Sequence, residues 1–63
     1  MQPDGKSSAE LARAYEAGRN ARERRKERKE APLYEMGPGG LTLRNAWRSG
    51  WDERDSEIKR RAA

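Results

Sequence analysis

The sequence predicts an all-α protein in which two helices are joined by a Pro/Gly-rich loop into a helical hairpin, behind a disordered N-terminal leader. Strong helix formers, namely Ala, Arg, Glu and Lys, fill most of the chain before Pro32. After Thr42, apolar side chains recur at helical spacing. Pro and Gly residues gather between these two stretches and indicate a turn. The predicted order is a leader over residues 1–7 and a single two-helix domain over residues 8–63, with a helix at about 8–30, a loop at 31–42 and a helix at about 43–60.

The first helix is predicted to begin at Ser8. The run from Ser7 to Glu10 fits the S-x-x-E capping box, in which serine and glutamate satisfy the first free backbone amides of a helix. Pro32 disfavours helical backbone angles in the residue before it, so the helix should end near Ala31. The apolar stripe of this helix consists of Leu11, Ala14, Tyr15, Gly18 and Ala21.

The second helix begins near Leu43 in this prediction, with Thr42 as its candidate cap. Its apolar stripe consists of Leu43, Ala46, Trp47, Gly50, Trp51 and Ile58.

A glycine inside a helix costs about 1 kcal/mol relative to alanine, so Gly50 and Gly18 suggest that the two helices approach closely there. We expect Tyr15, Trp47 and Trp51 to surround this crossing. The alternative interpretation leaves the two tryptophans exposed to stack on nucleic-acid bases. Three residues of the loop, Leu33, Tyr34 and Met36, are expected to close the end of the hairpin.

The positive charge is concentrated in one segment. Charged residues make up 41% of the chain and leave a formal net charge of +4. Seven bases and three acids lie between Arg19 and Glu30, so the net charge of this segment, +4, equals that of the whole chain. This distribution indicates a surface that contacts phosphates. The alternative is a solvated helix stabilised by alternating charges.

On a continuous helix, several of these bases would share one face, and two arginines of the second helix would extend it. Arginine suits phosphate because its planar group donates two parallel hydrogen bonds. The candidate RNA-binding residues are Arg19, Arg22, Arg25, Lys26, Lys29, Arg44 and Arg48.

The sequence offers few groups for catalysis. It contains no cysteine and no histidine, which excludes thiolate metal sites, cysteine nucleophiles and the commonest general base. The carboxylates Asp52, Glu53 and Asp55 are expected to face solvent. We therefore expect no enzymatic activity, cofactor or metal. No apolar run is long enough for a membrane span or a signal peptide, so a cytoplasmic protein is expected.

The run from Arg44 to Trp51 resembles the R-x-x-W-x-x-G-W signature of the ribosome modulation factor family, which consists of small ribosome-hibernation proteins and includes phage-encoded relatives. The segment Tyr15-Glu16-Ala17-Gly18 followed by Arg22 is similar to the family's Y-x-A-G-x-x-G-R. The segment from Pro32 to Tyr34 lies where the family has a Pro-Tyr pair. In this sequence Ala21 replaces the second family glycine, and the interval from Gly18 to Pro32 is about one helical turn longer than is typical.

The resemblance implies two helices that bind ribosomal RNA of the small subunit, block initiation and favour inactive ribosome dimers. It assigns Gly18, Trp47, Gly50 and Trp51 to the scaffold, and Arg22 and Arg44 to RNA contacts. The alternative is a phage- or plasmid-encoded accessory protein that uses the same scaffold to inhibit a host protein. Whether the chain forms a homodimer is left open by the sequence.

Overall fold

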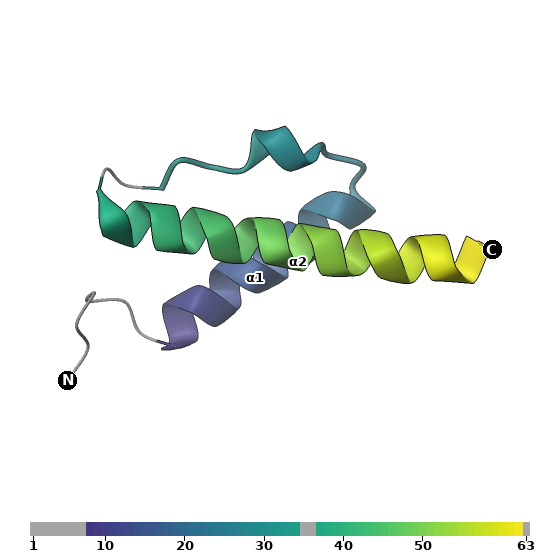
Figure 1. The fold of residues 1–63 in the computed structure, drawn as a ribbon, viewed down its shortest axis with the longest axis horizontal. Helices are drawn as coiled ribbons and strands as arrows, with labels where there is room; N and C mark the ends of the chain where they lie inside the picture. Colours follow the sequence, from purple (N-terminus) through teal and green to yellow (C-terminus); the bar gives the residue numbers. More distant parts are fainter. Residues whose placement is uncertain (1–7, 35–36, 63) are drawn as a thin grey trace.

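The computed structural model describes residues 8–34 and 37–62, and within them the chain is entirely helical or irregular. Helix α1 spans Ser8–Glu23, a short 3-10 helix η1 spans Arg28–Glu30, and helix α2 spans Pro38–Ala62. Figure 1 shows α1 crossing behind α2, with the linker that contains η1 running back along the opposite edge of α2. The predicted all-α fold of two helices joined by a linker is confirmed, and because the linker runs back along α2, the two helices point in roughly the same direction. The predicted leader over residues 1–7 lies outside the described residues.

Helix α1 begins at Ser8 as predicted but ends at Glu23, so the predicted helix over residues 8–30 is wrong in its second part. The helix closes in a Schellman motif: the Lys26 amide donates to the Ala21 carbonyl over 2.9 Å, and the Arg25 amide donates to the Arg22 carbonyl over 3.0 Å. Arg25 occupies the left-handed position of this motif, with φ at 65°. The helix stops where its apolar stripe stops, because beyond Ala21 no helical face could be buried.

The linker runs from residue 24 to residue 37 rather than over the predicted loop at 31–42. Its η1 turn is held at the start by the Glu30 carboxylate, which accepts from the Glu27 amide over 2.6 Å. Ala31 follows it and is buried against Ala21 and Trp47. The linker therefore adds a third layer to the small core.

Helix α2 begins at Pro38, five residues before the predicted start at Leu43. Proline suits the first helical position because it lacks the amide hydrogen that would be unsatisfied there and its φ is already helical. The Leu41 amide donates to the Gly37 carbonyl over 3.2 Å and makes the first turn. Thr42 is consequently inside the helix, and its predicted role as a cap is wrong.

The two helices touch backbone to backbone where the sequence places its two interior glycines. A Cβ added at Gly18 would lie 1.9 Å from the Trp47 carbonyl oxygen, and one added at Gly50 would lie 2.0 Å from the Tyr15 carbonyl oxygen. The predicted close approach is confirmed. Trp47 is 4% exposed and belongs to the core, which excludes it as a base-stacking residue.

The packing of the three loop residues differs from the expectation. Leu33 is 71% exposed and Tyr34 is 41% exposed, so neither side chain plugs the core. Met36, the third residue expected there, lies outside the described residues. Lys26 lies at Trp51 and Ala31 lies at Arg44, so the linker runs back along the side of α2.

We expect Gly50→Ala to destabilise the fold by about 2 kcal/mol or more, because its methyl group would overlap the Tyr15 carbonyl and push the helices apart. Thermal unfolding followed by circular dichroism measures this effect. The matched control is Ser49→Ala at the exposed neighbouring position, which should change stability by less than about 0.5 kcal/mol. Equal stability of the two variants would contradict the close approach.

Candidate nucleic-acid interface

The structure separates the seven predicted RNA-binding cations into three groups. The single basic face expected on a long first helix does not exist, because α1 ends before three of them, Arg25, Lys26 and Lys29. Two cations lie between the helices, two lie between α2 and the linker, and three lie on the linker itself.

Arg19 and Arg22 form ion pairs between α1 and α2. The Arg19 guanidinium donates to both Glu57 carboxylate oxygens over 3.1 and 3.2 Å. Arg22 Nε donates to Asp55 Oδ1 over 2.7 Å, and its guanidinium lies 5.5 Å from the centre of the Trp51 ring. These two arginines therefore stabilise the helix pair, and their role in RNA binding stays a prediction.

These ion pairs change the titration of the acids. The hydrogen bond from Arg22 lowers the pKa of Asp55, with a second contribution from Lys59. The hydrogen bond from Arg19 lowers the pKa of Glu57, and the same contact raises the pKa of Arg19.

A further cation, Arg54, extends this network. Its Nη1 donates to Glu57 over 3.0 Å, and its Nε lies 2.9 Å from Glu23 Oε2 as an ion pair without hydrogen-bond geometry. Together with Arg19, it places two cations around the Glu57 carboxylate.

Two of the three acids expected to face solvent form ion pairs instead. Asp55 is half-buried in the network just described, and Asp52 accepts from Arg28 Nε over 2.9 Å. Only Glu53, of these three carboxylates, is exposed without an ion pair among the residues the structure describes.

One face of α2 holds the linker in place. Trp51 Nε1 donates to the Lys26 carbonyl over 2.8 Å, and Arg44 Nε donates to the Ala31 carbonyl over 3.4 Å. Arg48 lies between them on the helix and is half-buried, with its Nε enclosed and unpartnered. Arg44 and Arg48 thus lie half-buried at the linker, and their predicted contact with RNA stays a prediction.

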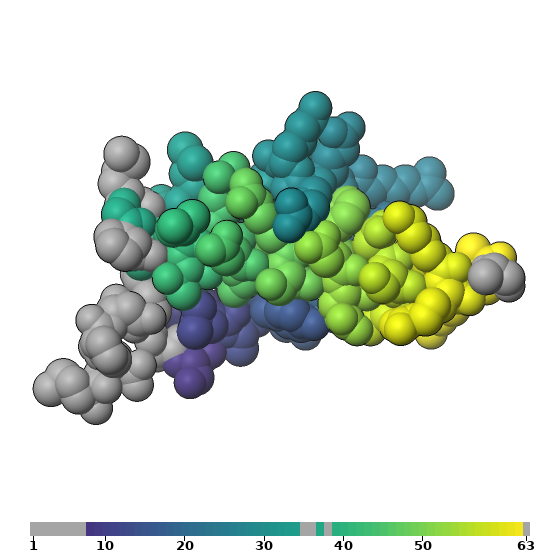
Figure 2. All heavy atoms as spheres, viewed as in Figure 1, coloured from purple at the N-terminus to yellow at the C-terminus, as the bar shows by residue number. Residues whose placement is uncertain are grey.

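Two of the predicted cations on the linker, Arg25 and Lys26, form with their neighbour Arg24 what we call the turn cluster. All three side chains are exposed, and none makes an ion pair within residues 8–34 and 37–62. Arg25 and Lys26 border a shallow depression of about 300 Å³ that is also lined by Trp51 and by the acids Glu27 and Asp55. Lys29, farther along the linker, is exposed but lies 3.3 Å from Glu27. Figure 2 shows the linker side chains gathered along one edge of α2.

Sequence reasoning missed Arg24 because a continuous helix would have turned it away from the basic face. The signal that could have identified it is the uninterrupted basic tripeptide from Arg24 to Lys26. The chain has one other run of three cations, Lys59 to Arg61, but only the Arg24–Lys26 run begins within one turn of the end of the apolar stripe at Ala21.

Comparison with known proteins adds no family: no family model matches the chain, and no curated protein or solved structure matches it. In the described part of the chain, no group of three or more His, Cys, Asp or Glu residues could hold a metal ion. No helix there is both long enough and apolar enough to cross a membrane.

The depressed pKa of Asp55 predicts acid lability. Its ion pair stabilises the fold fully above the ordinary carboxyl pKa of 3.8, and this stabilisation is lost as the pH falls through the lower folded value. We expect Asp55→Asn to lower the melting temperature at pH 7 and to flatten its decline between pH 4 and pH 2, as recorded by circular dichroism. Glu53→Gln is the control and should leave the pH profile unchanged. Parallel profiles for wild type and Asp55→Asn would refute this role.

Proposed function

We propose that the protein binds RNA through the turn cluster and silences translation in the cytoplasm by occupying ribosomal RNA of the small subunit. The observation that supports this most is the turn cluster itself, since its three consecutive cations are exposed and lack an ion pair among the described residues. Phosphate groups of RNA are the natural partners of such a cluster, because neutralising them releases bound counterions.

The backbone at Arg25 strengthens the argument. The left-handed position that closes a Schellman motif favours glycine, and a side chain there costs roughly 1 kcal/mol. An arginine in this position gains no ion pair and no burial in the described structure. Backbone strain without a structural benefit is typical of functional sites.

The intramolecular ion pairs also favour RNA over the alternative partner, a host protein. A protein-inhibiting surface would be expected to use the acids of the charged segment. Glu23 pairs with Arg54, Glu27 pairs with Lys29, and Glu30 accepts from the Glu27 amide. These acids are engaged within the protein, whereas the cations of the turn cluster are not.

The resemblance to the ribosome modulation factor family supplies the ribosomal part of the proposal. Each residue of the R-x-x-W-x-x-G-W signature contributes to the scaffold, since Arg44 and Trp51 hold the linker, Trp47 fills the core, and Gly50 admits the α1 backbone. A shared signature of this kind favours a shared scaffold. The longer basic segment would then be this protein's own contact with RNA.

The experiment is co-sedimentation with bacterial ribosomes over a salt series. We expect the protein to migrate with the small subunit or with ribosome dimers. The double variant Arg24→Gln/Lys26→Gln should bind roughly tenfold more weakly, and its salt slope should fall by about 0.7 for each phosphate that the variant no longer neutralises.

The matched control is Arg60→Gln/Arg61→Gln, which removes two exposed cations at the end of α2 that also lack an ion pair in the described structure. Its binding should stay within about twofold of wild type. Equally weakened binding in both variants would show attraction by net charge alone. Absence of co-sedimentation at low salt would exclude the ribosomal function and direct attention to a host protein.

Arg25→Gly separates binding from folding. Glycine relieves the left-handed backbone, so we expect the variant to be more stable by about 0.5–1 kcal/mol while its RNA affinity falls. Thermal melting and co-sedimentation of the same sample measure the two effects. Unchanged affinity in the stabilised variant would remove Arg25 from the interface.

A further inference from the structure

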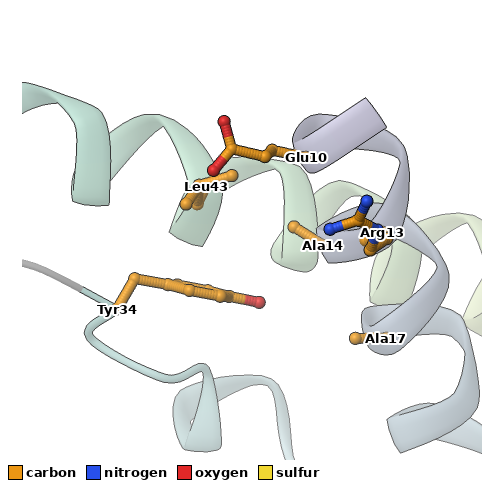
Figure 3. Close-up of a pocket in the computed structure, with 6 residues that line it drawn as sticks. All are labelled: Glu10, Arg13, Ala14, Ala17, Tyr34 and Leu43. Atoms are coloured by element: carbon orange, nitrogen blue, oxygen red, sulfur yellow. The ribbon is translucent and has the colours of Figure 1, made fainter. Parts of the chain in front are cut away.

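A second concave surface lies at the other end of α1. An open groove of about 370 Å³ is lined by Glu10, Arg13, Ala14 and Ala17 of α1, Leu43 of α2, and Tyr34 of the linker. Figure 3 shows the Tyr34 ring extending from the linker toward α1, opposite the two alanines. This volume lies within the range of about 300–1,000 Å³ that is usual for small-ligand sites.

Tyr34 is held in an unusual way. Its φ of 62° lies in the left-handed region, where a bulky aromatic residue is a genuine outlier. The side chain is nevertheless 41% exposed, so core packing does not compensate for this backbone. Partial burial raises the pKa of Tyr34 above its ordinary value of 10.0.

The rim of the groove carries the Glu10 carboxylate as well as one cation, Arg13. Arg13 is exposed and makes no hydrogen bond or ion pair with any residue that the structure describes. The floor opposite the ring consists of methyl groups from Ala14 and Ala17, which leave room for a flat group. An aromatic ring, a flat apolar floor and one cation together match a planar base with a phosphate attached.

We propose that this groove takes an unpaired nucleobase of the RNA, stacked on Tyr34, with its phosphate at Arg13. The inference rests on the proposed function and gives it a second contact.

Arg13 and Arg25 are twelve residues apart, so α1 and its closing turn place the groove and the turn cluster roughly 18 Å from each other. A few nucleotides of one strand span such a distance. The protein would therefore prefer single-stranded or looped RNA to a duplex.

The test combines RNA binding with nuclear magnetic resonance. The variant Tyr34→Gly removes the ring and suits the left-handed backbone, so weaker binding cannot be attributed to misfolding. We expect it to weaken binding of a single-stranded oligoadenylate about tenfold and binding of a duplex less than twofold. Tyr34→Phe should stay within twofold of wild type, and so should Leu33→Ala, which truncates the exposed neighbouring side chain.

In a parallel titration, millimolar 5′-AMP should shift the methyl signals of Ala14 and Ala17 in wild type but not in Tyr34→Gly. The inference would be overturned if the methyl signals did not shift, or if wild type and Tyr34→Gly bound oligoadenylate with equal affinity. Either result would favour a protein partner for the groove. If wild type binds neither form of RNA, the proposed function fails, and the AMP shifts still decide whether the groove accepts a base.

Discussion

The structure depends on one close contact, the backbone-to-backbone approach of α1 and α2 at Gly18 and Gly50. Each glycine lies against a carbonyl of the opposite helix, so no side chain separates the helices there. This contact fixes how the helices cross and brings the second half of α1 beside the second half of α2. Arg19 and Arg22 come to lie opposite Glu57 and Asp55 for that reason.

The same contact explains why the linker is part of the core. Two helices that touch through glycines bury little apolar surface between them, and the buried apolar residues are mostly small. Ala31 of the linker completes the cluster around Trp47. Hydrogen bonds from Trp51 and Arg44 to linker carbonyls then attach the segment along α2. The linker is therefore a structural layer that also presents the turn cluster.

The parts of this fold that the sequence predicts are those encoded by local pattern. The start of α1, the apolar stripe of α2 and the close approach at Gly18 and Gly50 follow from spacing alone. The end of α1 could not be predicted, because the residue in its left-handed closing position is Arg25 rather than glycine. The start of α2 was missed for a related reason: Pro38 is as compatible with a first helical turn as with a loop.

The candidate site was harder to predict than the fold, because its chemistry depends on which charges are left over after folding. The sequence shows seven bases between Arg19 and Glu30 but not their partners. Folding pairs Arg19, Arg22 and Arg28 with acids of α2, which lie 24 or more residues away in the chain. Such partners are invisible to helical periodicity, which relates only residues three or four apart.

The distribution of acids thus determines which cations remain without an ion pair in the described structure. Acids of α2 neutralise the cations that stabilise the helix pair, and none of them forms an ion pair with the Arg24–Lys26 turn in the described structure, although Asp55 lines the same depression. The backbone is also strained at this turn, because Arg25 takes the place of glycine. Charge and backbone strain coincide at one point outside the core. A protein with so small a core can keep such a strained turn only because the glycine contact and the linker bonds stabilise the rest. The proposed binding surface and the scaffold therefore use different side chains.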